Sequence, residues 1–490
     1  MHSHIHRQGS GPRLHRRQGL LGLGGVAMAV AAPPGLAHAQ RRAPNGLVVC
    51  GSTPLEWTRR FADFHIARLG DVTFGNPGAS INYPYDLLAL ALFELTATSG
   101  ETRYRDWAER MIGSWVAEDG SLRVPAEQLE LRKSWNANQL RRRHLDDSPV
   151  ALVLLRMYLR TKEPRYRLAV DKLFDQISNF PRTLDGVYSW EPSQIWLDGL
   201  WFIMPFLARY AKEFGRPEIF DDLKRQYQLV WVHMRDPHTG LFYHGYDERR
   251  QIYWADRLTG LSSSFWSRAV GWYAMSLVDT LYAVPKDHPL AAELTAQARH
   301  LAAALVTQQD PQTGLWWIVM DKPRRYGNYL EASASAMFIY FLARGVNAGF
   351  LSDQYIPAIL RAYAGLLEEK LYIDAAGGLN LLDVVQSAGL GARGGDMGAV
   401  TGAPPASPPA TANDSPYPPS PPQVVRSSRD AIPWGRDGSF EYYVNQPNVM
   451  NNSHGLGPVV RAGNEVARLS ATAIGGRAAP ACRARLLGRR

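Results

Sequence analysis

The stretch QIWLDGLWFIMPFLARYAKEFG, Gln194 to Gly215, places an acid at the start of a long apolar run that stops at a glycine. Apolar residues recur in it at helical spacing, and glycine commonly follows the last turn of a helix. Asp198 stands among large aromatic and aliphatic side chains, where a charged group is costly to bury. The pattern predicts a buried helix, and it leaves Asp198 three possible roles: a helix cap, a member of an ion pair, or a proton donor.

Six apolar segments of this kind alternate with six amphipathic ones along the chain. The other apolar segments span 85–100, 146–164, 266–285, 330–346 and 453–469, and several are expected to stop at a glycine or proline, such as Gly100 and Gly345. The amphipathic segments span 56–69, 103–117, 165–177, 217–234, 290–306 and 355–371. An apolar helix needs cover on every side, whereas an amphipathic helix buries one face only. The alternation therefore predicts an inner and an outer layer of helices.

The starts of the apolar segments recur at intervals of about 50 to 70 residues, a spacing typical of stacked helical hairpins. These starts are marked by Tyr83, Asp147, Asp198, Trp266 and Glu331. The pattern predicts an all-α fold, a closed (α/α)6 barrel over residues 46–470 with short β-turns at one end. An open solenoid of the same hairpins is the alternative. A closed barrel would gather the acids and aromatic residues of the inner-helix starts around one pocket.

Two weakly repeated segments are expected to form those turns. DPHTGLFYHGYDE begins at Asp236 and DPQTGLWWIVMDK begins at Asp310, and both continue into alternating aromatic residues. Turn-forming residues followed by alternation predict tight turns with short strands.

The net charge of +9 comes from the two ends of the chain. Four arginines in residues 1–39 and five in residues 477–490 account for all of it, so the body between them is neutral. A neutral body gives no electrostatic case for binding nucleic acid. Residues 471–490 are interpreted as a solvated basic tail.

The N-terminal segment has the features of an export signal. HRRQGLLGLGGVAMAVAA joins Arg16 and Arg17 to a mild apolar run, and Ala37 and Ala39 are the small residues that a signal peptidase requires. Residues 1–39 are therefore predicted to be a signal peptide of the twin-arginine type, cleaved after Ala39 to give a periplasmic or secreted protein. The run is too short to span a bilayer, and no other segment is apolar enough to do so.

The cysteines and one proline-rich stretch stand apart from the helical pattern. Cys50 and Cys482 are the only cysteines, and because they lie near opposite ends of the chain their pairing is left open. With no CxxC motif and no Cys/His cluster, a zinc site is not expected. Nine prolines fall between Pro404 and Pro422, so residues 393–430 are predicted to be a disordered insertion that loops outside the barrel.

Four stretches carry a specific resemblance: QIWLDGLW, DPHTGLFYHGYDE, WADRLTGLSSSFWSRAVGWYAMSLVD and RDGSFEYYVNQPNVMNNSHGLGP. From about Tyr83 to about Glu465 the chain resembles family 105 of the glycoside hydrolases, the unsaturated rhamnogalacturonyl hydrolases. The resemblance implies action on the unsaturated sugar that a pectin lyase leaves, which carries a C4=C5 double bond beside the ring oxygen. Protonation at C4 gives an oxocarbenium ion and water adds at C5, so the reaction needs one well-placed acid.

The same resemblance assigns roles to the acids at two inner-helix starts. Asp198 matches the family's proton donor, and Trp196 and Trp266 are expected to shield it from water and to contact the sugar. Asp146 matches a second acid that holds a sugar hydroxyl or Asp198 itself. For its neighbour Asp147 we expect an interaction with the helix dipole instead.

Three further residues are predicted to bind substrate. Arg268 and Trp272 are four positions apart and share one helix face, so a guanidinium and an indole could hold the sugar's carboxylate and ring together. His244 is expected to contact the substrate or the water. By residue type alone, a packed arginine and a structural histidine are the simpler interpretations, and the resemblance reverses that preference. A histidine typical of the family is replaced by Ser193 and Gln194, which leaves the exact substrate open.

The sequence implies no metal and no cofactor, and its expected partner is an acidic unsaturated oligosaccharide. The alternatives are an unsaturated glucuronyl hydrolase acting on glycosaminoglycan fragments and a non-catalytic sugar-binding barrel, which would keep the tryptophans but would not need Asp198. A terpenoid cyclase-like barrel would require a metal-binding acid cluster that the sequence lacks. A structural repeat protein would not explain why acids and aromatic residues gather at the helix starts.

Overall fold

The computed structural model describes residues 47–76, 79, 82–123, 145–191, 193–391, 435–470, 474 and 482. The predicted signal peptide and the proline-rich insertion lie outside the described residues, and only residues 474 and 482 of the predicted basic tail are described. The part of the chain from residue 41 onward is one compact unit.

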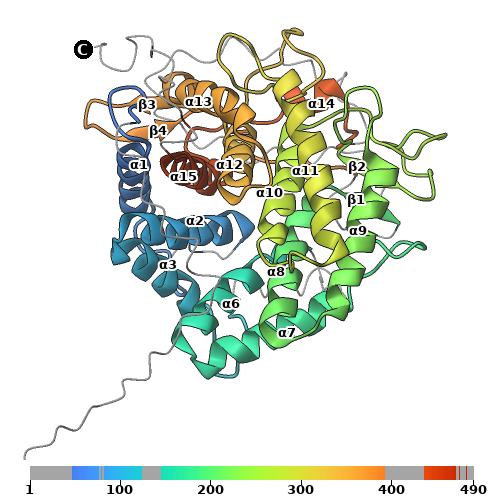
Figure 1. Cartoon of the computed structure of the whole chain (residues 1–490), viewed down its shortest axis with the longest axis horizontal. Helices are drawn as coiled ribbons and strands as arrows, with labels where there is room; N and C mark the ends of the chain where they lie inside the picture. The colour runs from blue at the N-terminus through green and yellow to red at the C-terminus, as the bar shows by residue number, and fades with distance from the viewer. Residues whose placement is uncertain are drawn as a thin grey trace, which may run out of the picture. The chain divides into compact units, whose positions relative to one another are not determined.

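Six helices with mostly buried residues form a closed inner ring (Figure 1). They are α2 (Tyr83–Ser99), α6 (Val150–Thr161), α8 (Asp198–Phe214), α10 (Ser267–Leu281), α12 (Ala332–Ala348) and α15 (Ser453–Ala467). Each packs against the next in chain order, and α15 packs against α2, which closes the ring. The closed (α/α)6 barrel is thereby confirmed, and the open solenoid is excluded.

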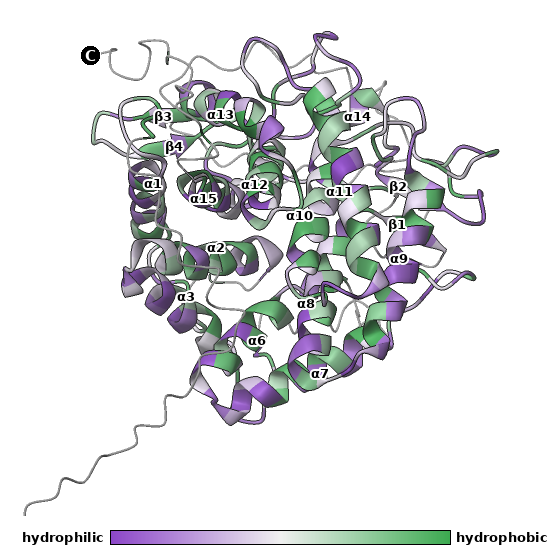
Figure 2. Ribbon diagram, in the orientation of Figure 1, coloured by the Kyte–Doolittle hydropathy of each residue, from purple (hydrophilic) through white to green (hydrophobic). Residues whose placement is uncertain are grey.

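Six outer helices cover the inner ring. They are α1 (Pro54–Leu69), α3 (Thr102–Ser114), α7 (Pro164–Ser178), α9 (Glu218–Met234), α11 (Pro289–Thr307) and α13 (Ile356–Gly365). Figure 2 shows hydrophilic and hydrophobic bands side by side on outer helices such as α3, α7 and α9, as expected for helices that bury one face. Among the described residues, no helix is long and apolar enough to cross a bilayer.

The glycine signals for helix ends were mostly, but not always, correct. Gly100 and Gly215 follow the last turns of α2 and α8 in the left-handed conformation, with φ of 78° and 64°. Gly345 was expected to end α12, but the helix continues to Ala348 and Gly349 takes the left-handed position. A Cβ at Gly345 would lie 2.6 Å from Leu351 Cδ1, so this glycine permits close packing rather than a stop.

A two-stranded pairing sets the geometry at the start of α8. Strands β1 (Gln194–Trp196) and β2 (Gly245–Asp247) are antiparallel, with Trp196 opposite Gly245. The pairing continues one step further, where Leu197 N donates to His244 O at 3.0 Å. The register therefore places His244, which precedes β2, beside Leu197, which precedes α8. A second pair, β3 (Leu371–Ile373) and β4 (Leu379–Leu381), follows α13 and a short π-helical turn over 366–370.

The two repeated DPxTG segments adopt the same turn. Asp236 accepts a hydrogen bond from Thr239 N at 2.7 Å, and Asp310 accepts one from Thr313 N at 2.9 Å. Each turn also contains a left-handed glycine four residues after its aspartate. The predicted tight turns are thus observed, and a short strand, β2, follows the first of them.

A buried ionic cluster lies between the inner helices, in the second half of each helix that contributes to it. Arg461 donates to Glu94 Oε1 and to Asp279 Oδ2, each at 2.8 Å, and Arg344 donates to Glu465 Oε1 at 2.9 Å. All five side chains are less than 10% exposed. Burial alone would raise the pKa of Glu94, but the arginines outweigh it and lower the pKa to about 2. Four of the inner helices, α2, α10, α12 and α15, are thereby tied to one another.

The N- and C-terminal parts of the described chain meet. Helices α1 and α15 pack side by side (Figure 1), and a disulfide joins Cys50 to Cys482 across 432 residues of sequence. The pairing that the sequence left open is therefore formed.

Candidate active site

The starts of the inner helices converge on one place. The Tyr83 hydroxyl at the start of α2 lies 2.6 Å from His454 Nε2 at the start of α15. Burial raises the pKa of Tyr83, and the charges of Asp146, Arg268 and Asp198 also act on it. Charged residues at the starts of α6, α10 and α8 are thus close enough to Tyr83 to influence its ionisation. This convergence is what a closed barrel was expected to produce.

Asp198 is the first residue of α8 and is 7% exposed. The cap position itself belongs to Leu197, and no side-chain cap bond is made there. Asp198 Oδ2 lies 3.2 Å from His244 Nε2. The alignment is not that of a good hydrogen bond, and neither atom has another partner among the described residues. Asp198 is therefore not the cap of α8, and its carboxyl group lies against the imidazole of His244.

His244 is fully buried behind Asp198. Its Nδ1 lies 2.6 Å from the hydroxyl of Tyr443 in helix α14 (Phe440–Val444). Its ring lies 4.8 Å from the Trp266 ring and 5.6 Å from the Trp196 ring, centroid to centroid. Asp198, His244 and Tyr443 therefore form a chain of polar contacts enclosed by indole rings.

The two tryptophans beside His244 are themselves stacked on other aromatic residues. Trp196 lies parallel to Trp190, with ring centroids 4.8 Å apart, and Trp266 lies parallel to Tyr443 at 5.6 Å. The Nε1 atom of Trp266 is buried and has no hydrogen-bond partner among the described residues. Both rings lie against His244, and together with its complete burial they separate it from water.

Arg268 and Trp272 lie on α10, as predicted, and each is 1% exposed. The guanidinium of Arg268 donates to Val385 O at 2.7 Å and to Ser333 Oγ at 3.3 Å. It forms no ion pair with an acid in the described part of the chain. A buried cation without a carboxylate is costly, so its position suits an anionic ligand. Trp272 packs against the rings of Trp201, Phe202 and Tyr83, and its centroid lies 4.8 Å from that of Trp201. We call these four rings the aromatic floor.

The two acids before α6 differ in exposure. Asp146 and Asp147 lie in a 3-10 turn, Leu145–Asp147, where Asp146 is half-buried and Asp147 is exposed. The charge of Asp146 acts on Tyr83, whereas that of Asp147 acts on Asp86. Asp146 is therefore the more buried of the two acids, and both act on residues at the start of α2.

Sequence reasoning did not single out Tyr443 or His454 as site residues. Both lie in the last of the four resembling stretches, after the proline-rich segment, and Tyr443 is 199 residues from the histidine that it contacts. Burial lowers the pKa of His454 well below its ordinary value, and the Arg268 charge acts in the same direction. The signal available was the run EYY in a stretch already identified as similar to the family.

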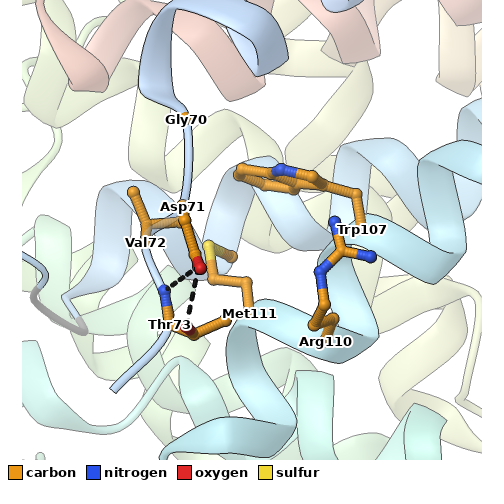
Figure 3. A pocket seen from close by; sticks show the side chains of 7 residues that line it. All are labelled: Gly70, Asp71, Val72, Thr73, Trp107, Arg110 and Met111. Carbon is orange, nitrogen blue, oxygen red and sulfur yellow. Dashed lines mark hydrogen bonds between the residues drawn. The ribbon is translucent and has the colours of Figure 1, made fainter. Parts of the chain in front are cut away.

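Other features of the structure lie apart from this place. A cavity of about 220 Å³ opens between the loop after α1 and helix α3, with Asp71 on one side and Trp107 and Arg110 on the other (Figure 3). It contains none of the predicted site residues. Among the described residues, Cys50, Glu368 and Cys482 are close enough together to hold a metal, but their two sulfurs are joined in the disulfide.

The fold is that of an (α/α)6 barrel, and comparison with known proteins identifies the family to which it belongs. The sequence model of Glycosyl Hydrolase Family 88 matches residues 57–398. The chain belongs to this family and is a glycoside hydrolase, within the unsaturated glycuronyl hydrolases of families 88 and 105.

Three relatives illustrate the match. A family 105 glycoside hydrolase from C. acetobutylicum is 31% identical with a TM-score of 0.70, over 84% of this chain and 99% of that one. The unsaturated rhamnogalacturonyl hydrolase YesR of Bacillus subtilis is 32% identical over 178 residues, 36% of this chain and 48% of that one. The unsaturated glucuronyl hydrolase of Bacillus sp. GL1 shares the fold, with 16% identity and a TM-score of 0.50 over 68% of this chain and 89% of that one.

Proposed function

We propose that the protein hydrates the C4=C5 double bond of an unsaturated galacturonyl residue at the non-reducing end of rhamnogalacturonan oligosaccharides. Asp198 is the proton donor. The observation that supports this role is the contact between Asp198 Oδ2 and His244 Nε2 at 3.2 Å, in a buried place where neither atom has another partner among the described residues.

The reaction uses one carboxyl group twice. Asp198 gives its proton to C4, which leaves positive charge shared between C5 and the ring oxygen. Water adds at C5 and loses a proton to the carboxylate of Asp198, which restores the acid. The resulting hemiketal opens and releases the sugar to which the uronyl residue was linked. No attack at the glycosidic carbon by a second carboxylate is needed.

The surrounding residues bind and orient the sugar. Arg268, a buried cation without an acidic partner in the described part of the chain, pairs with the uronyl carboxylate. Asp146 accepts from a sugar hydroxyl near Tyr83. Trp266 offers its unpartnered Nε1, Trp196 shields His244, and Trp272 lies in the aromatic floor below the sugar.

Similarity to YesR supports rhamnogalacturonan as the substrate, because that relative is named an unsaturated rhamnogalacturonyl hydrolase and is 32% identical over the matched residues. The glucuronyl hydrolase of Bacillus sp. GL1 is 16% identical and shares the fold alone. Activity on glycosaminoglycan fragments is the alternative.

We also propose that the protein is exported and works outside the cytoplasm. The twin arginine at Arg16 and Arg17 and the small residues before Gln40 support this. The disulfide between Cys50 and Cys482 supports it independently, because disulfides persist in oxidising compartments.

The substitution Asp198→Asn tests the proposed donor. An amide keeps the shape of the side chain but supplies no acid, so kcat should fall by about 10²- to 10⁴-fold. Hydration destroys the conjugation between C4=C5 and the carboxylate, so the rate can be followed as the loss of near-ultraviolet absorbance of lyase-generated rhamnogalacturonan disaccharides.

Asp185→Asn is the matched control. Asp185 Oδ2 also lies close to a histidine nitrogen, 2.5 Å from His233 Nε2, but this pair is not among the residues that gather at the inner-helix starts. This variant should keep the wild-type rate. An Asp198→Asn enzyme as fast as wild type would refute the assignment, and faster bleaching of glucosamine-linked fragments would favour the glucuronyl alternative.

A further inference from the structure

We propose that Tyr443 is a positioning residue for the reaction: its hydroxyl donates to His244 Nδ1 and so turns the N–H group at His244 Nε2 towards Asp198. This inference rests on the proposed function and adds to it a residue that does not touch the substrate.

The geometry joins three side chains in one line. The Tyr443 hydroxyl lies 2.6 Å from His244 Nδ1, and His244 Nε2 lies 3.2 Å from Asp198 Oδ2. Tyr443 and His244 are both fully buried, whereas Asp198 is 7% exposed. Asp198 is therefore the member of the line that a sugar can reach, and Tyr443 acts on it through the imidazole.

The phenol is the donor in this contact. Burial raises the pKa of Tyr443 well above its ordinary value, and the nearby Tyr442 and Asp198 act in the same direction, so the hydroxyl keeps its proton. His244 Nδ1 is the hydroxyl's one hydrogen-bond partner among the described residues. If the hydroxyl accepted from Nδ1 instead, its own proton would be buried without an acceptor there, which is unfavourable.

The direction of this hydrogen bond decides which ring nitrogen of His244 carries the hydrogen. A neutral imidazole that accepts at Nδ1 carries its hydrogen on Nε2, which faces Asp198 Oδ2. An imidazole with N–H groups on both nitrogens could not accept at Nδ1 and would lose the bond from Tyr443. The phenol therefore favours the one neutral tautomer of His244 that turns an N–H group towards Asp198.

The stacking of Trp266 on Tyr443 holds the phenol in place. The segment that carries Tyr443 is anchored at its beginning, where Arg436 pairs with Gly391 and Gly391 N donates to Arg436 O at 2.9 Å. Gly391 and Arg436, which lie on the two sides of segment 392–434, are therefore joined by their backbones. Helix α14 follows Arg436 closely in the sequence and places Tyr443 against His244.

Tyr443→Phe removes the hydroxyl and keeps the ring that stacks on Trp266. We expect kcat to fall about 10-fold, the typical effect of one lost hydrogen bond to a polar group, while KM changes less than about 2-fold. Tyr442→Phe is the matched control, because its hydroxyl accepts from Gly389 N at 3.1 Å and does not contact His244. It should leave kcat and KM at wild-type values.

The tautomer of His244 gives a readout that does not depend on activity. Nitrogen NMR of labelled wild-type protein should show a neutral ring protonated at Nε2, and Tyr443→Phe should lose that preference. A wild-type ring protonated at Nδ1 would overturn the proposal even if the variant failed to fold. Equal kcat in Tyr443→Phe and wild type would overturn it as well. Absence of activity in wild type on every unsaturated uronide would refute the proposed function and leave the tautomer measurement intact.

Discussion

Asp86 has a carboxyl group that the fold buries, and no positively charged partner offsets that burial among the interactions that act on its pKa. It lies in the first turn of α2, is 1% exposed, and its Oδ1 has no hydrogen-bond partner among the described residues. Burial raises the pKa of Asp86 well above its ordinary value of 3.8, and the charge of Asp147 raises it further. The folded protein therefore keeps this proton to a higher pH than the unfolded chain does.

The substitution Asp86→Asn should stabilise the protein at pH 7. Because the folded pKa is raised, the protonated group stabilises the fold fully below about pH 3.8 and this contribution is lost as pH rises. Each unit by which folding raises the pKa of Asp86 lowers the free energy of unfolding by about 1.4 kcal/mol at pH values above the folded pKa. Asparagine does not ionise and avoids that loss. The Tm of Asp86→Asn should exceed that of wild type at pH 7, and this difference should disappear as the pH is lowered to 3.

Asp71→Asn provides a control of opposite sign. Hydrogen bonds from Thr73, first from its side chain and then from its backbone, lower the pKa of this exposed acid, so the asparagine variant should gain nothing at pH 7. If Asp86→Asn destabilised the protein at pH 7 and this effect shrank towards pH 3, Asp86 would instead be ionised and paired in the folded state.

Between the inner helices, the ionic cluster replaces apolar packing. Glu94 of α2 and Asp279 of α10 share Arg461 of α15, and the Trp201 Nε1 at the start of α8 also donates to Asp279 Oδ2, at 3.0 Å. Trp201 packs in turn on Trp272. The cluster therefore joins neighbouring inner helices and also supports the aromatic floor of the candidate site.

Glu94→Gln should destabilise the barrel by about 3–5 kcal/mol at pH 7, because it leaves buried positive charge uncompensated. The folded pKa of Glu94 is about 2, below its ordinary value of 4.5, so its ionised form stabilises the fold above pH 4.5 and this contribution is lost as pH falls towards 2. The difference between variant and wild type in urea unfolding should shrink over the same interval.

Asp63→Asn breaks an ion pair of similar length, 2.9 Å to Arg103, on the exposed surface of the outer helices. It should change the free energy of unfolding by less than about 1 kcal/mol. A constant effect of Glu94→Gln between pH 7 and pH 3 would contradict the proposed ionisation.

The whole chain is closed by the disulfide and by the packing of its first and last helices. The bond between Cys50 and Cys482 encloses almost the entire barrel, because the two cysteines are 432 positions apart in the sequence. Cross-links over long loops restrict the unfolded chain most. In this protein the link fastens the region after α15 to the region before α1.

Cys482→Ser should lower the free energy of unfolding by about 2–4 kcal/mol, and wild type in reductant should unfold at the same temperature as the variant.

Thiol alkylation connects this bond to the proposed export. Exported protein should contain no free thiols, whereas a variant with Arg16 and Arg17 replaced by lysine should remain inside and react at both cysteines. Free thiols in exported wild type would contradict both the bond and its link to compartment.

The sequence by itself determined the helices and their alternation, because amphipathic and apolar segments differ in local composition and caps act within a few residues. It also placed Asp198, Trp266 and Arg268 at inner-helix starts, and the structure brings those starts together, although their roles remain predictions. Only the tertiary structure decided that Tyr443 contacts His244, that Arg461 joins Glu94 to Asp279, and that Cys50 meets Cys482. These contacts join residues some 180 to 430 positions apart, and local periodicity carries no information about distance across a closed ring.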